Sequence, residues 1–197
     1  MNDFTLTTFL TSNTGIDVGV AENIINKQKS MLVEKGELLL KEGEICRHSF
    51  FVEKGLLRYY SIDAKGKEHI IQFAPEGWFV SDRESVYFNH PSQYFIQALE
   101  ESRIIALDEN FIAELAKHDP SFMEFNNRLL HNHIRHLQRR INMLLSATAE
   151  ERYLDFINIY PDILLRVPQT MVASYLGIAP ESLSRVRKEL AQKNFKA

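Results

Sequence analysis

The stretch VPQTMVASYLGIAPESLSRVRKEL, residues 167–190, decides the fold class because it reads as two helices around a tight turn. Residues 169–176 form the first predicted helix, and Gly177 supplies the left-handed turn that ends it. Pro180 opens the second helix, since proline fits the first helical position without losing a hydrogen bond. The apolar positions that we expect to be buried are Val172, Ala173, Leu176, Ile178, Leu183, Val186 and Leu190. This pattern predicts a helix-turn-helix, with an arbitrary helical hairpin as the alternative.

Three polar residues of the second helix share its outer side. Glu181, Ser184 and Arg185 stand at relative positions 1, 4 and 5, so their side chains can enter a major groove together. There an arginine can bind guanine with two hydrogen bonds, a glutamate can accept one from cytosine, and a serine can serve either role. The residues placed to contact phosphates are Gln169, Arg187 and Lys188. Double-stranded DNA is therefore a predicted partner, and side chains that merely face solvent are the alternative.

A long helix is predicted before this motif, in residues 119–146. Asp119 is its expected N-cap and Pro120 its first helical residue. Apolar residues then recur at spacings of 4, 3, 4 and 3, as in a two-stranded coiled coil. They are Leu130, Ile134, Leu137, Ile141 and Leu144. The spacing predicts a homodimer, and the alternative is one stripe of an intramolecular helix packed on the chain's own barrel. The arginines that surround the stripe, expected to face solvent, are Arg128, Arg135, Arg139 and Arg140.

Residues 30–108 show short β-rich runs separated by glycine-bearing turns, which is typical of a jelly roll or barrel. The expected strands are 31–33, 38–40, 49–52, 56–61, 69–73, 78–80, 94–98 and 103–107. Residues 63–68 form a hairpin turn in which Gly66 can adopt positive φ. Short helices are expected at 20–26 and 108–118, and a further helix at 148–160.

The predicted fold is therefore α+β: an N-terminal β jelly-roll barrel, a long dimerisation helix and a C-terminal all-α helix-turn-helix domain. The expected domain limits are 1–118, 119–146 and 147–197. Charge is unevenly distributed, because residues 1–118 carry 12 basic against 18 acidic residues and residues 180–197 carry 5 against 2. The basic end suits phosphate contacts. With no apolar run of about 20 residues and no secretory signal, we expect no membrane segment and a cytoplasmic location.

Four segments give a resemblance that covers nearly the whole chain: KGELLLKEGE (35–44), FFVEKGLLRYY (50–60), GWF (77–79) and GIAPESLSRVRKEL (177–190). Together they resemble the Crp/Fnr superfamily of bacterial transcription factors. The resemblance implies a sensor domain, a dimer helix and a recognition helix, with RNA polymerase as a further partner. The glutamate and arginine usual in that helix match Glu181 and Arg185. Ser184 is similar to the Fnr branch, whose half-sites contain a TTGA core, whereas Pro180 replaces an arginine of the Crp branch.

The sensor departs from the family's nucleotide-binding pattern. The usual Phe-Gly-Glu turn reads Phe79-Val80-Ser81-Asp82 here, and the usual arginine of the phosphate pair is replaced in Ser92-Gln93. Without a guanidinium, a cyclic phosphate loses its bidentate charged partner. We therefore expect an unidentified small-molecule effector rather than cyclic AMP bound in the usual way. The candidate ligand-binding residues are Phe79, Asp82, Arg83, Ser92 and Gln93.

The cysteine and histidine content bears on whether the protein holds a metal cofactor or is an enzyme. Cys46 is the only cysteine, so the Fnr-type cluster ligands are lacking, and a small buried residue is expected there. A cupin-type enzyme would need converging metal ligands, but the histidines of the sheet region, His48, His69 and His90, lack paired spacing. His133 and His136 share a helix face, where solvated histidines are the commoner case. We expect no enzyme activity, metal or certain cofactor.

The family usually follows its recognition helix with a β-hairpin wing. This sequence extends seven residues past Leu190, so the wing is expected to be missing or shortened. Phosphate contacts usual in the wing would then come from elsewhere. A sensing or protein-interaction module that no longer binds DNA is the alternative function.

Overall fold

The computed structural model describes residues 4–194 and divides the chain into two compact units. The first unit contains residues up to Ile62 together with Ile71–His131. The second contains Asp63–Ile70 together with residues from Asn132 onward. The boundary falls inside the long helix, so each unit includes part of it. The predicted domain limits, which set that helix apart, remain a prediction.

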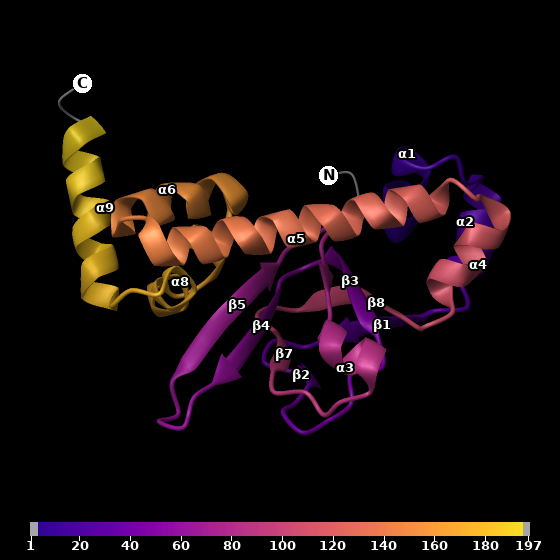
Figure 1. Cartoon of the computed structure of the whole chain (residues 1–197), viewed down its shortest axis with the longest axis horizontal. Coiled ribbons are helices and arrows are strands. Elements are labelled where there is room, and N and C mark those ends of the chain that lie inside the picture. Colours follow the sequence, from indigo (N-terminus) through magenta and orange to yellow (C-terminus); the bar gives the residue numbers. More distant parts are fainter. Residues whose placement is uncertain (1–3, 195–197) are drawn as a thin grey trace. The chain divides into compact units, whose positions relative to one another are not determined.

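The first unit is built around two four-stranded sheets (Figure 1), in the orders β1-β8-β3-β6 and β2-β7-β4-β5. The strands are β1 (Lys29–Val33), β2 (Leu38–Leu40), β3 (Ser49–Lys54), β4 (Leu57–Ile62), β5 (Glu68–Ala74), β6 (Phe79–Val80), β7 (Phe95–Ala98) and β8 (Ser102–Leu107). Strand pairs with a described register are antiparallel, as between β3 and β8 or β4 and β7. The predicted fold class is confirmed, but in residues 4–194 the strands form two sheets instead of a closed barrel.

Two apolar clusters stabilise this unit. One is formed by the inward residues of both sheets, such as Val52, Leu57 and Ile104, which are fully buried. The other joins the first sheet to helices and contains Phe51, Leu115 and Phe125. Burying side chains of this size contributes about 2 kcal/mol each, so the two clusters hold the helices and sheets together.

Four short helices accompany the sheets, namely α1 (Leu6–Asn13), α2 (Val18–Ile25), α3 (Arg83–Phe88) and α4 (Phe111–His118). The expected helices at 20–26 and 108–118 correspond to α2 and α4. Neither α1 nor α3 was predicted. α1 begins because the Thr5 side chain accepts a hydrogen bond from the Thr8 N–H.

The long helix α5 spans Phe122–Ser146 and begins later than the sequence predicts. Asp119 lies in extended backbone and ends α4, with φ −137° and ψ 102°. Its carboxylate accepts hydrogen bonds from the N–H and hydroxyl of Ser121. The expected start at Pro120 was wrong because a turn separates Asp119 from the helix.

The second unit is helical apart from the hairpin turn and the first residues of β5. Its helices after α5 are α6 (Ala149–Ile159), α7 (Ile163–Arg166), α8 (Gln169–Leu176) and α9 (Pro180–Asn194). A capping box between Thr148 and Glu151 starts α6. The core contains Phe156, Tyr160 and Tyr175, whose ring centroids lie 5.3 to 5.6 Å apart. The hairpin turn at 63–68 is confirmed, with Gly66 at φ 78°. Within residues 4–194, no helix is long and apolar enough to span a membrane.

Candidate nucleic-acid interface

The helix-turn-helix forms as the sequence predicts. α8 ends at Leu176 and is capped by Gly177, which has φ 65° and ψ 35°. The Gly177 N–H donates to the carbonyl oxygens of Ala173 and Ser174. The Ile178 N–H bonds to the Ala173 oxygen at 3.0 Å, so two residues close the turn. Leu183 is fully buried and Val186 nearly so, and these side chains hold α9 against the core.

The predicted base-reading residues are brought together on one open face of α9. Glu181, Ser184 and Arg185 are all exposed, as is Lys188 one turn further on. Within the described chain, no hydrogen bond or ion pair engages the side chain of any of the three predicted base readers. Gln169 is exposed at the start of α8. Their donors and acceptors are therefore free to meet another molecule.

Two other basic residues of α9 differ in their surroundings. Arg187 is half-buried at the side of the helix. Lys193, one of the charges counted in the basic end, forms an ion pair with Glu150 of α6 at 2.8 Å. The positive charge on the open face is therefore concentrated in Arg185 and Lys188.

Sequence reasoning missed two arginines that support this motif. The Arg152 guanidinium donates to the Leu176 oxygen at 2.8 Å, and that of Arg140 donates to the Tyr175 oxygen at 3.0 Å. The last carbonyl groups of a helix lack partners within the helix, and its C-terminus attracts cations. Arg140, expected to face solvent beside the seam, instead caps α8. No local signal could reveal this, because the partners lie 35 residues apart.

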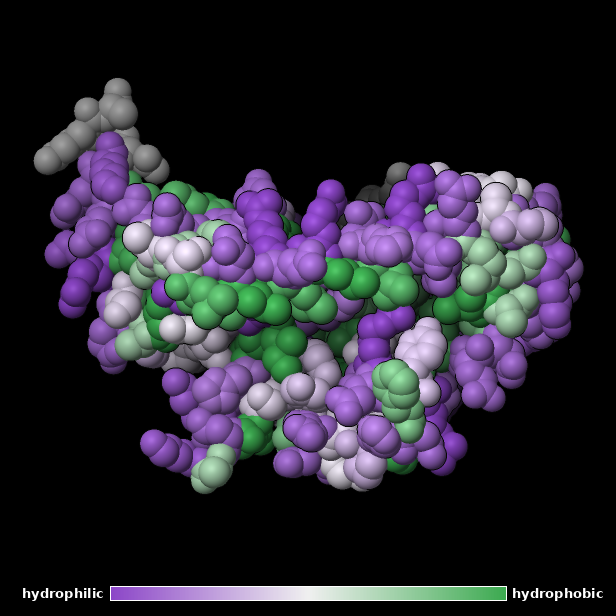
Figure 2. Space-filling model, in the orientation of Figure 1, coloured by the Kyte–Doolittle hydropathy of each residue, from purple (hydrophilic) through white to green (hydrophobic). Residues whose placement is uncertain are grey.

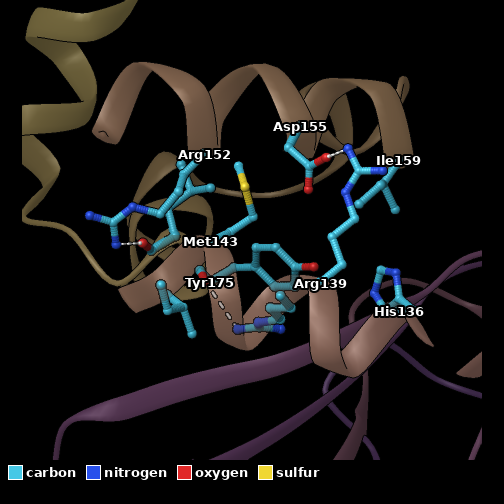
Figure 3. Close-up of a pocket in the computed structure, with 10 residues that line it drawn as sticks. His136, Arg139, Met143, Arg152, Asp155, Ile159 and Tyr175 are labelled. Carbon is cyan, nitrogen blue, oxygen red and sulfur yellow. Dashed lines mark hydrogen bonds and ion pairs between the residues drawn. The ribbon is translucent and has the colours of Figure 1, made fainter. Parts of the chain in front are cut away.

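A small recess lies beside these arginines, between α5, α6 and α8 (Figure 3). Its volume is about 340 Å³, the open mouth included. Figure 3 shows the Tyr175 ring next to Met143, and Arg139 reaching Asp155, with which it forms an ion pair. Burial and the neighbouring charges of Arg140 and Arg139 lower the pKa of His136. The recess is rich in cationic groups, yet those of Arg139, Arg140 and Arg152 already have partners within the chain.

The predicted dimer seam is exposed in the single chain. Ile134, Leu137, Ile141 and Leu144 are 36 to 57 % exposed, and Leu130 is half-buried. Figure 2 shows a hydrophobic band along α5. Other residues of α5 pack within the chain itself. Phe122 and Phe125 belong to an apolar cluster of the first unit, and Met143 lines the recess of the second unit. α5 thus has one apolar stripe packed on its own chain and another left open.

Comparisons with known proteins match most of this chain. The family model of the cyclic nucleotide-binding domain matches residues 31–119. The anaerobic regulatory protein of Pasteurella multocida is 28% identical over 176 residues, covering 84% of this chain and 63% of that protein. The fumarate and nitrate reduction regulatory protein of Yersinia pestis is 27% identical over 185 residues, covering 88% and 72%. The chain thus spans less than two thirds of the first of these relatives.

A solved structure agrees in fold. FixK2 from Bradyrhizobium japonicum superimposes with a TM-score of 0.70 at 19% identity, covering 85% of this chain and 86% of that one. The sensor match, the named regulators and the shared fold agree with each other. Together they support an assignment of the chain to the Crp/Fnr superfamily. The matched relatives are regulators and not enzymes.

The five candidate ligand-binding residues differ in their burial and contacts. Phe79 packs against Phe9 and Phe51, with centroid distances of 5.4 and 4.8 Å. Asp82 is 3% exposed, and its carboxylate caps α3 by accepting from the Glu84 and Ser85 N–H groups. Both residues therefore have structural partners in the described chain.

The other three candidates lie around the same helix and the next turn. Arg83 is exposed, with its guanidinium 5.2 Å from the Tyr87 ring centroid. Ser92 is buried, and its hydroxyl is bonded to the N–H and oxygen of Tyr94, whereas Gln93 is exposed. A ligand-binding role for these five residues remains a prediction.

Tyr59, a half-buried polar residue that was not predicted, is influenced by the charge of Asp82. Burial, with a smaller contribution from the charge of Asp82, raises the pKa of Tyr59. Cys46 is buried as expected, and burial raises the pKa of its thiol. Tyr59 and Cys46 therefore remain protonated at neutral pH. Among the described residues, no group of three histidine, cysteine or acidic side chains is placed to hold a metal ion.

Proposed function

We propose that this protein is a transcriptional regulator of the Crp/Fnr type that binds double-stranded DNA as a homodimer. The observation that carries the proposal is the exposed face of α9, where Glu181, Ser184 and Arg185 point outward without partners in the described chain. A rigid helix that presents a glutamate, a serine and an arginine on one side has the groups needed to read base edges.

Each residue of the interface has a proposed role. Arg185 binds guanine O6 and N7, Glu181 accepts from cytosine N4, and Ser184 adds a third contact. The residues that contact phosphates are Gln169, Arg187 and Lys188. The resemblance of α9 to the Fnr branch favours a half-site with a TTGA core.

The open stripe on α5 supports the dimer. Ile134 is 42% exposed and Ile141 is 57% exposed, although both belong to a regular apolar repeat. A second copy of α5 would cover this repeat and remove it from water. In a symmetric dimer, two recognition helices can bind half-sites one helical turn apart, about 34 Å.

Sensing is proposed on the strength of the family alone. We infer an unidentified small-molecule effector at the first unit, and not cyclic AMP bound in the usual way, because no arginine stands at the position of the phosphate pair. Contact with RNA polymerase and a cytoplasmic location belong to the same proposal.

A DNA-binding titration tests the proposal. Fluorescence anisotropy of a labelled duplex with an inverted TTGA repeat is measured with the wild type, Arg185→Gln and the matched control Arg135→Gln. Arg135 is exposed on α5, away from the seam, and the same charge is removed. We expect Arg185→Gln to weaken binding about 10-fold to 100-fold and to reduce discrimination against a substituted half-site, whereas the control binds as the wild type does.

Salt provides the second arm of this experiment. Binding should weaken steeply as salt rises, because DNA-bound counterions are released. A wild-type protein that fails to bind, or that binds scrambled duplexes equally well, would contradict the proposal. Failure to bind any duplex would favour a protein-interaction role.

A further inference from the structure

One guanidinium joins three elements of the second unit. Arg140, which comes from α5, donates to the Ile70 oxygen of β5 at 2.8 Å and to the Tyr175 oxygen of α8 at 3.0 Å. It also lies 3.7 Å from the centroid of the Tyr175 ring. A planar guanidinium can hold two acceptors in fixed directions while it stacks on an aromatic face, which an ammonium cannot do. Arg140 therefore fixes the end of α8 relative to α5 and to the start of β5.

A serine of α8 makes a second connection to the same strand. The Ser174 hydroxyl accepts from the Ile70 N–H at 3.0 Å and donates to the Glu68 oxygen at 2.8 Å. β5 is the last strand in its sheet order, so its outer edge has no neighbouring strand among the described residues. Ser174 and Arg140 together supply partners for three backbone groups along that edge.

The hairpin that presents this edge is itself well defined. The Asp63 carboxylate accepts from the N–H groups of Lys65 and Lys67 and lies 2.9 Å from the His69 ring nitrogen. The Asp63 N–H also bonds to the Lys67 oxygen. The turn therefore holds Glu68 and Ile70 in place for Ser174.

These contacts matter for DNA because α8 carries the turn and α9. α8 has only eight residues and is capped by Gly177, so its orientation fixes where α9 begins. We propose that Arg140 and Ser174 form a polar lock that positions the helix-turn-helix for DNA by holding α8 on α5 and on the 63–70 hairpin. The inference rests on the proposed DNA-binding function and assigns positioning residues to it.

Neither residue is suited to be a DNA contact itself. Arg140 is half-buried and is held by two carbonyl groups and an aromatic ring. Ser174 is also half-buried, and its hydroxyl is occupied on both sides. The lock therefore raises DNA affinity indirectly, because it fixes the orientation of α8 and α9 before DNA binds. Without it, the orientation of α8 and α9 must be fixed during binding, which lowers affinity.

The experiment compares four lock variants with one control. Arg140→Gln removes the guanidinium, and Arg140→Lys keeps the positive charge without the planar group. Ser174→Ala removes the hydroxyl, and Ser174→Thr retains it. The control is Arg135→Gln. DNA affinity of the full chain is measured by anisotropy at several salt concentrations, and hydrogen exchange is followed at the Ile70 amide and along α9.

We expect Arg140→Gln to bind about 10-fold more weakly and Ser174→Ala about 3-fold to 10-fold more weakly, as expected for the loss of one or two hydrogen bonds. The slope of log affinity against log salt should not change, because no phosphate contact is lost. In Ser174→Ala the Ile70 amide should exchange faster while α9 stays protected. Ser174→Thr should restore both values, and Arg140→Lys should fall between glutamine and wild type.

Several outcomes would overturn the lock. Affinity unchanged in both Arg140→Gln and Ser174→Ala would do so, as would a salt slope reduced by about one in Arg140→Gln, which would mark a direct phosphate contact. If the amides of α9 lost their protection from hydrogen exchange in Ser174→Ala, Ser174 would have a merely structural role in keeping α9 folded. A wild type that binds no DNA would instead overturn the proposed function, and unchanged Ile70 exchange in Ser174→Ala would then still refute the lock.

Discussion

Asp63 illustrates how one side chain can organise a segment that the helix-turn-helix depends on. Its carboxylate closes the turn of the 63–70 hairpin, and two residues of that hairpin bond to Ser174. The hydrogen bond with His69, followed by those from the Lys67 and Lys65 N–H groups, lowers the pKa of Asp63 from 3.8 to about 2. Because all three bonds favour the ionised form, the turn is tied to the charge of one residue.

This shift gives a pH prediction for the hairpin. The pKa of Asp63 is lower in the folded state, so its contribution to stability is complete above pH 3.8 and is lost as pH falls through about 2. His69→Ala should raise the pKa of Asp63 toward 3.8, since His69 is the largest cause of the shift. NMR titration of the Asp63 carboxyl measures both values. A wild-type pKa of 3.8, unaffected by the substitution, would contradict this account.

At the scale of elements, the turn between α8 and α9 and the two faces of α5 place the proposed interface. Gly177 combines positive φ with a close neighbour, because an added Cβ would lie 3.1 Å from Leu144 Cδ2. Gly66 also has positive φ, but no atom would lie within 4 Å of its Cβ. A side chain at Gly66 would therefore cause backbone strain alone, whereas a side chain at Gly177 would cause both backbone strain and crowding.

Gly177→Ala should therefore destabilise its surroundings more than Gly66→Ala does. Backbone strain costs about 1 to 2 kcal/mol at either position, and only Gly177→Ala adds crowding against Leu144. Hydrogen exchange of the α8 and α9 amides measures the free energy of local opening. Exchange as slow in Gly177→Ala as in the wild type would show that the turn tolerates a side chain.

The sequence predicts what depends on neighbouring residues. The limits of α8, the turn at Gly177 and the start of α9 at Pro180 were all predicted, because turn and capping preferences act within a few residues. The capping role of Asp82 at α3 was not recognised, although an aspartate before a helix is a local signal. The similarity of residues 79–82 to a nucleotide-binding turn predicts a ligand contact for Asp82, whereas in the structure Asp82 caps α3.

The contacts of Arg140 lie beyond such reasoning. Its partners are 70 and 35 residues away in sequence, at Ile70 and Tyr175. In the sequence, Arg140 lies beside an apolar stripe, and this position predicts solvent exposure. Only the tertiary structure shows that a second side of α5 faces the chain's own helices, with Arg140 on it.

At the scale of the whole molecule, the proposed function requires two copies of the chain. The open stripe of α5 supplies the surface, and Leu137 lies in its middle. Leu137→Arg should give monomers, because two arginines would face each other across an apolar seam. Leu154→Arg on α6 is the matched control, since Leu154 is 42% exposed against 36% for Leu137 and lies outside the seam.

Sedimentation velocity distinguishes the two variants. The control should sediment as a dimer at concentrations where Leu137→Arg sediments as a monomer. Monomeric Leu137→Arg should also bind an inverted repeat more weakly than the wild type, because the two half-sites are then bound independently. A dimer that persists in Leu137→Arg would exclude the stripe as the interface.

The central claim is that a dimer reads DNA through α9, and selection from a random duplex library tests it most directly. The purified chain is incubated with the library, and the bound sequences are enriched and sequenced. The account predicts an inverted repeat with half-sites centred about 10 base pairs apart, and a change of half-site in Arg185→Gln. A library from which the wild-type protein enriches no sequence would contradict it.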